Sequence, residues 1–131
     1  MDLIQCLKKV INEESDIPAE LQLGYLDATE SLVIYSLPGS SVSQEYMDGA
    51  KDMNINYEIG MKSKDGAKAE VSLWRISEKL EKIKNIVSED ESFIFNKLTV
   101  TSKPFLNSFD GQGWVVFLLN FTVSITTYEG E

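Results

Sequence analysis

Apolar and polar residues alternate along the last third of the chain, from Trp114 to Tyr128. The odd positions form an almost unbroken apolar row, made of Val115, Phe117, Leu119, Phe121, Val123, Ile125 and Thr127. The even positions begin apolar, at Trp114, Val116 and Leu118, and turn polar from Asn120 onward. A period of two in β-branched and aromatic residues predicts a strand with one face in the core. At about 3.3 Å per residue it is roughly 45 Å long, and other elements are expected to cover Trp114, Val116 and Leu118.

Further strands are predicted upstream. Met53–Lys62 alternates cleanly and is typical of a half-buried antiparallel strand. Ser31–Leu37 reads as a strand that Pro38-Gly39 stops, and Phe93–Ser102 reads as another. Leu21–Leu26 indicates a short extended segment.

Two stretches have helical spacing. The first begins after Asp2, a possible cap, ends around Asn12–Ser15 before Pro18, and has the apolar stripe Leu3, Ile4, Leu7, Val10 and Ile11. The second spans about Ala67–Val87, and Trp74 is expected to widen its stripe. That stripe is Ala69, Leu73, Ile76, Leu80, Ile83 and Val87.

Two polar connections are long for a compact domain. Gly39–Asp52 is predicted to be a loop, and loops of that length are uncommon unless they bind something or are disordered. Lys103–Gly113 is predicted to be a wide hairpin loop that holds Phe105, Leu106 and Phe109. Apolar side chains at such a place are either tucked under the sheet or offered to a neighbour.

The order of these elements predicts one α+β domain over residues 1–131. It consists of an antiparallel sheet with two helices packed on one face and a long C-terminal hairpin. A chain of 131 residues with 43% hydrophobic content is large enough for such a core.

The chain is acidic, with 21 acidic and 12 basic residues and a net charge of −9. Eleven acids and three bases fall in Met1–Gly60, which gives −8, and Met61–Glu131 carries ten and nine, which gives −1. This balance disfavours nucleic-acid binding and attraction to an anionic membrane. The acidic half either promotes solubility, or repels DNA, or meets a basic partner.

The residues for chemistry are sparse. The sequence has no histidine, which removes the commonest general base and metal ligand, and Cys6 alone forms no internal disulfide or zinc cluster. Cys6 lies in an apolar pattern and is predicted to be a small core residue. The acidic groups Glu13-Glu14-Asp16 and Glu89-Asp90-Glu91 fall in polar turns, where carboxylates are usually solvated.

Asp48 with Asp52, or Asp110, lacks the ligand spacing of a calcium loop. We therefore expect no catalytic site, metal or cofactor, but a structural or binding protein. No apolar run reaches the length of a membrane helix, so an intracellular protein without a membrane partner is expected.

Three stretches together resemble a known family. They are Leu3-Ile-Gln-Cys-Leu-Lys-Lys-Val-Ile11, Asn56-Tyr-Glu-Ile-Gly-Met-Lys62 followed by the helix with Trp74, and the stretch Phe105–Val123. The chain resembles small minor capsid proteins of tailed phages of Gram-positive bacteria, which are similar to tail-terminator and head–tail joining proteins.

The resemblance implies a virion subunit that is assembled in the bacterial cytoplasm and forms a ring, commonly six-fold, at the head–tail junction. It implies contacts with other phage head or tail proteins, and DNA that at most passes through an acidic lumen without specific binding. Unpaired sheet edges and a half-apolar second face are liabilities that such assembly removes. The residues expected at the interfaces are Phe105, Leu106, Phe109, Trp114, Val116, Leu118, Tyr46 and Met47.

Two other readings stay open. In the first, the protein is a monomeric acidic binding or inhibitor module that neutralises a basic partner. In the second, it is a ligand-binding or catalytic α+β cup with Trp74, Tyr57 and Trp114 around a pocket.

Overall fold

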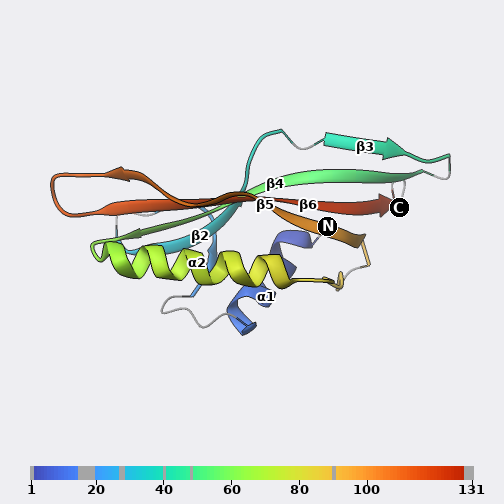
Figure 1. Cartoon of the computed structure of the whole chain (residues 1–131). Helices are drawn as coiled ribbons and strands as arrows, with labels where there is room; N and C mark the ends of the chain where they lie inside the picture. Colours follow the sequence, from blue (N-terminus) through green and yellow to red (C-terminus); the bar gives the residue numbers. More distant parts are fainter. Residues whose placement is uncertain are drawn as a thin grey trace.

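A computed structural model describes residues 2–14, 20–26, 29–39, 41–47, 49–89 and 91–128. Within these ranges the chain forms two helices and six strands. Their bounds are α1 Leu3–Glu14, β1 Gln22–Leu23, β2 Ser31–Ser36, β3 Ser41–Glu45, β4 Ala50–Ser63, α2 Gly66–Lys82, β5 Phe93–Phe109 and β6 Val115–Tyr128. Both helices lie on the same side of the sheet (Figure 1), which we call its helix face. The α+β class with two helices on one face is confirmed.

The strands lie in the order β1-β2-β4-β6-β5. β2 pairs with the second half of β4 and β3 with the first half, so β2 and β3 follow one another along the same edge of β4. Every pair is antiparallel except β1 with β2, which makes the sheet mixed. The long C-terminal hairpin, β5 with β6, is confirmed.

β6 agrees with the predicted strand apart from Trp114, which precedes it, and it lies between β4 and β5. Odd positions of β4 and β6 face each other, as in the pairs Tyr57 with Phe121 and Ile59 with Leu119. Directly opposed residues share a face, so both apolar rows lie on the helix face. The rings of Tyr57 and Phe121 stack there with centroids 5.6 Å apart.

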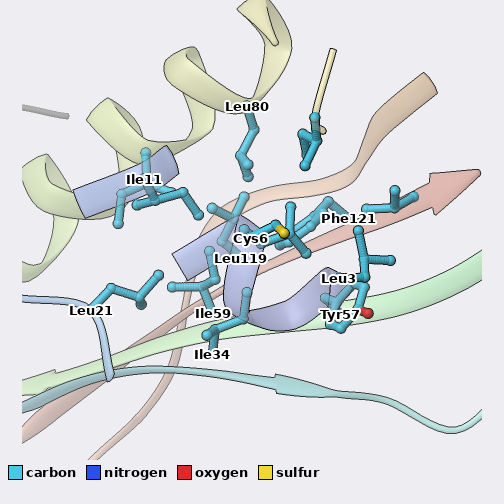
Figure 2. Packing of buried hydrophobic residues seen from close by; sticks show 14 of the residues in the cluster. Leu3, Cys6, Ile11, Leu21, Ile34, Tyr57, Ile59, Leu80, Leu119 and Phe121 are labelled. Atoms are coloured by element: carbon cyan, nitrogen blue, oxygen red, sulfur yellow. The ribbon is translucent and has the colours of Figure 1, made fainter. Parts of the chain in front are cut away.

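The core fills the space between the helix face and the two helices (Figure 2). Its fully buried members are Phe121, Leu3, Leu7, Ile11, Leu21, Ile34, Ile59, Met61, Leu73, Ile76, Leu80 and Leu119. Leu21 is held by Asn12, whose Oδ1 accepts from the Leu21 amide at 2.8 Å and whose Nδ2 donates to the Leu21 carbonyl at 3.0 Å. This side chain therefore joins α1 to the start of β1.

α2 begins within one residue of its predicted start but ends earlier than predicted. Asp65 caps it by accepting from the Lys68 amide at 3.0 Å. The predicted end at Val87 is wrong, because the helix stops at Lys82 and Ile83 is already extended. Ile83, Ile86 and Val87 are β-branched, which favours extended backbone. Ile86 reaches the core there, while Val87 is 74% exposed.

The prediction that Trp74 widens the buried stripe of this helix is also wrong. The Trp74 side chain is 40% exposed, and Lys103 Nζ lies 6.0 Å from its ring centroid. Lys103 also pairs with Glu81. The outer flank of α2 is thus held to β5 by a cation over the indole face and by an ion pair.

The predicted loop Gly39–Asp52 is wrong as well. It contains β3 and the start of β4, which form a hairpin around Tyr46–Gly49. The turn closes with the Tyr46 amide donating to the Ala50 carbonyl at 2.8 Å, and Gly49 adopts φ 90°. β3 is rich in Ser and Gln, so its pairing comes from backbone hydrogen bonds and leaves no apolar alternation to detect.

The predicted wide loop Lys103–Gly113 is likewise wrong, because β5 continues to Phe109 and only a tight turn follows. Pro104 suggests a break, but proline is tolerated in an edge strand, where its missing N–H faces no partner. Four register shifts in the β5–β6 ladder place extra residues in β5. These bulges let the strand bend while it stays paired.

Phe121→Ala tests the core. Removing this fully buried ring should lower the free energy of unfolding by about 3–5 kcal/mol. Val42→Ala is the control, since Val42 is 49% exposed on β3, and it should change stability by less than about 0.5 kcal/mol. Urea unfolding followed by circular dichroism measures both, and equal losses for the two variants would contradict this core.

Candidate interaction surfaces

The turn between β5 and β6 forms one end of the sheet, at the left of Figure 1. Beside it, at the end of β5, Phe105, Leu106 and Phe109 are 37%, 49% and 75% exposed. We call these three residues the β5–β6 tip. Of the two possibilities open from the sequence, the structure shows exposed side chains and not side chains tucked under the sheet. Their role as an interface stays a prediction.

The tip is apolar on both faces of the sheet. Leu106 pairs with Phe117 and so lies on the helix face, whereas Phe105 pairs with Leu118 and lies on the opposite, open face. The turn itself is fixed by Asp110, whose Oδ1 accepts from the amides of Gln112 and Trp114 at 2.9 and 3.0 Å. The tip is therefore a preorganised projection.

Trp114, Val116 and Leu118 are covered to different degrees. Leu118 is 9% exposed, and a Cβ placed on Gly60 would lie 3.1 Å from Leu118 and 3.4 Å from Leu26. The segment after β1 thus covers Leu118 across the glycine, where an added Cβ would make a tight contact with Leu118. Val116 and Trp114 are half-buried, and the Trp114 ring has Lys62 and Lys64 Nζ 5.4 and 5.2 Å from its centroid.

Tyr46 and Met47 lie far from the tip, in the β3–β4 turn at the other end of the sheet (Figure 1). Tyr46 is 41% exposed and donates from its hydroxyl to Asp52 Oδ2 at 2.7 Å, while Met47 is fully exposed. The candidate interface residues thus fall into two groups at opposite ends of one sheet.

A regular polar ladder crosses the open face between β4 and β6. Side chains of β6 donate to side chains of β4 at successive positions of one face, at 2.5–2.7 Å. The four rungs are Asp52–Thr126, Asn54–Ser124, Asn56–Thr122 and Glu58–Asn120. Tyr35 adds a hydroxyl donor to Glu58. Hydroxyl and amide groups thus predominate in this column.

The ladder changes the pKa of Asp52 on this face. The hydroxyls of Thr126 and Tyr46 donate to Asp52 and lower the pKa of its carboxyl below its ordinary value. Hydrogen bonds to the charged form favour that form.

A pocket that was not predicted from the sequence lies between the α2–β5 connection and the start of β5. Its volume is about 400 Å³. We call it the 85–95 pocket, lined by Asn85, Ile86, Val87, Ser88, Glu91, Phe93, Ile94 and Phe95. Val87 and Ile94 form an isolated antiparallel bridge and are 74% and 52% exposed. The feature of the sequence that could have indicated this pocket is the run of β-branched residues after Lys82, which ends α2 early.

Asp2 and Ser88 hold this connection against α1. Asp2 accepts from Ser88 Oγ and from the Glu89 amide, each at 2.8 Å. Lys9 pairs with Glu89 at 2.9 Å. One wall of the pocket is therefore anchored to the first helix.

The aromatic cup expected from Trp74, Tyr57 and Trp114 does not form. Tyr57 is buried against Phe121, and burial raises its pKa to about 12. Trp74 lies on the outside of α2 and Trp114 beside the β5–β6 turn, and none of the three lines the 85–95 pocket.

The other residues that the sequence analysis considered for chemistry do not form a recognisable site within the described ranges. Cys6 is 6% exposed, as predicted for a core residue, and burial raises the pKa of its thiol. In the described ranges no three His, Cys, Asp or Glu side chains gather as a metal site, and no helix is long and apolar enough to cross a membrane. Asp16, Asp48 and Asp90, which belong to the acidic groups considered above, lie outside the described residues.

Exposed apolar side chains at the ends of a long sheet are typical of proteins that act by contact with other proteins. The fold and its exposed ends therefore define a protein of the class that acts by binding other proteins. A family model of bacteriophage tail terminator proteins matches residues 10–127, and the chain belongs to that family. The family consists of structural phage tail proteins, so the chain is a structural component of a virion that interacts with other phage head or tail proteins. No curated protein sequence matches the chain significantly.

Thr126→Val tests the ladder on the open face. Loss of the hydroxyl donor should raise the pKa of Asp52 toward its ordinary value, which carboxyl NMR titration measures. Because the pKa of Asp52 is lowered in the folded state, its stabilising contribution is present above the unfolded pKa and disappears as pH falls through the folded pKa. The variant should therefore lose less stability in acid.

Thr122→Val is the control, because its partner Asn56 does not titrate. It should leave the Asp52 pKa unchanged. An Asp52 pKa that Thr126→Val fails to raise would contradict the hydrogen-bonded rung.

Proposed function

We propose that this protein is a non-enzymatic structural subunit that assembles with copies of itself into a ring at the head–tail junction. Membership in the tail terminator family supports the structural role in the tail. The observation that carries self-assembly is the β5–β6 tip, whose apolar side chains are exposed on both faces of a fixed hairpin. Six copies per ring, a minor capsid placement, a Gram-positive host and assembly in its cytoplasm complete the proposal, on the resemblance described above.

The energetic argument concerns apolar surface. Full burial of a leucine or phenylalanine side chain stabilises by about 1.5–3 kcal/mol. Phe105, Leu106 and Phe109 leave a large part of that stabilisation unrealised in the single chain, because they are 37–75% exposed. Contact with a neighbour recovers it at each interface of a closed ring, which leaves no tip uncovered.

The edge of β5 favours side-chain contact over continued strand pairing. This outer edge is interrupted by four bulges and by Pro104, and it carries the positive charges of Lys97 and Lys103. Such features are the usual protection against edge-to-edge pairing. We therefore assign the interface to the tip, with Trp114 and Val116 at its margin, and not to a sheet that runs on between subunits.

The charge of the chain suits a lumen through which DNA passes without specific binding. The net charge is −9, and Met1–Gly60 carries −8 of it. Like charge suppresses the counterion release that drives DNA binding. Tyr46 and Met47, in the turn at the far end of the sheet, are assigned to contacts with other head or tail proteins. The alternative of a monomeric acidic inhibitor receives no support from the family.

Leu106→Ser with Phe109→Ser tests self-assembly. The unsubstituted chain should sediment at several times its 14.7 kDa mass at tens of micromolar, and the variant as a monomer with unchanged circular dichroism. Leu23→Ser with Val42→Ser is the control. These side chains are 41% and 49% exposed, on β1 and on β3, which pairs with the half of β4 farther from the tip, so they should leave assembly intact. A strictly monomeric unsubstituted chain would refute the proposal.

A further inference from the structure

We propose that the β5–β6 tip of one copy enters the 85–95 pocket of the next copy, so that the copies associate head to tail. This inference rests on the proposed function and specifies the two surfaces through which the ring closes. Its basis is a projection and a recess of matching chemistry on the same chain.

The two surfaces match in apolar character. The tip presents Phe109 as its most exposed side chain, and the pocket is lined by Val87, Ile94 and Phe95 among others. A volume of about 400 Å³ lies within the range of sites that hold small ligands, so it has room for a phenylalanine ring. Val87 and Ile94 are exposed in the single chain, and an inserted ring would cover them.

A basic pair near the tip can meet an acidic residue of the pocket. Lys62 and Lys64 flank Trp114 beside the β5–β6 turn, and Glu91 lines the pocket. Insertion brings these lysines toward Glu91 of the neighbouring copy.

The positions of the two surfaces make the contact heterologous. Phe93 and Phe109 are the two ends of β5, so the pocket and the tip are separated by most of the length of this strand. Figure 1 shows the β5–β6 turn and the α2–β5 connection at opposite ends of the molecule. A projection that fits a separate recess generates a ring when the rotation between copies closes, whereas a contact between two identical tips stops at a dimer.

Both surfaces are preorganised in the single chain, before any contact with a second copy. Asp110 fixes the turn at the tip through two backbone amides, and Asp2 fixes the pocket wall through Ser88 and the Glu89 amide. Preorganised surfaces lose less conformational entropy on association.

Cysteine cross-linking tests which surfaces meet. The native thiol, Cys6, is buried with a raised pKa, so Phe109→Cys and Ile94→Cys each supply the reactive thiol of their chain. A short bis-maleimide should join the two variants in a mixture, and a chain with both substitutions should give a ladder of covalent multimers. Either single variant alone should give no cross-linked product.

The outcomes separate this inference from the proposed function. Cross-linking of Phe109→Cys to itself, or an assembling mixture that gives no product between the two variants, overturns the inference and leaves ring formation standing. An unsubstituted chain that remains monomeric at every concentration overturns both.

Glutamate substitutions give a second measurement on the same surfaces. Phe109→Glu and Ile94→Glu should each weaken association at least about thirtyfold, the effect of losing one hot-spot residue. An equimolar mixture of the two retains one intact tip and one intact pocket, so it should form a dimer and nothing larger. Val42→Glu, at a comparably exposed position on β3, should assemble normally. Normal assembly of Ile94→Glu overturns the inference.

Discussion

The unbroken pairing of β4 with β6 is the interaction on which the rest of the structure depends. All fourteen residues of β4, from Ala50 to Ser63, have a partner between Tyr128 and Val115 without a register shift. A slip of one residue would move every apolar side chain to the opposite face. This register therefore sets both surfaces at once, the apolar floor under the helices and the polar ladder on the open face.

The length of this pair has a consequence for the helices. Strands of fourteen residues span roughly 46 Å at about 3.3 Å per residue, whereas the seventeen residues of α2 span roughly 26 Å at 1.5 Å per residue. The helices cannot cover the whole sheet, so its ends carry apolar side chains without cover in the single chain. The β5–β6 tip and the β3–β4 turn are these two ends, which is why the candidate interface residues separate into two groups.

The sequence predicted what depends on periodicity and missed what depends on pairing. β6, the stripe of α1, the stripe of α2 as far as Leu80 and the buried Cys6 follow from residue spacing alone. β3 was invisible because Ser and Gln residues pair through the backbone, and β5 was cut short because Pro104 is compatible with a strand only where the edge is unpaired. The sequence singled out Phe105, Leu106 and Phe109 but left open whether they are covered, and the structure shows them exposed. The sequence could not locate the 85–95 pocket, which exists because the β-branched residues after Lys82 end the helix early.

The early end of α2 links the fold to assembly. A helix continued to Val87 would have kept Ile83 and Val87 on one stripe. Instead, the chain turns extended after Lys82, so that Ile86 enters the core while Val87 pairs with Ile94 beside it. The exposed pair Val87 and Ile94 and the 85–95 pocket beside it therefore both result from the extended backbone after Lys82. At the other end of β5, bulges and Pro104 keep the edge from pairing and carry the strand to Phe109. The same strand therefore has a recess where it begins and a projection where it ends, the condition under which identical copies join in one direction.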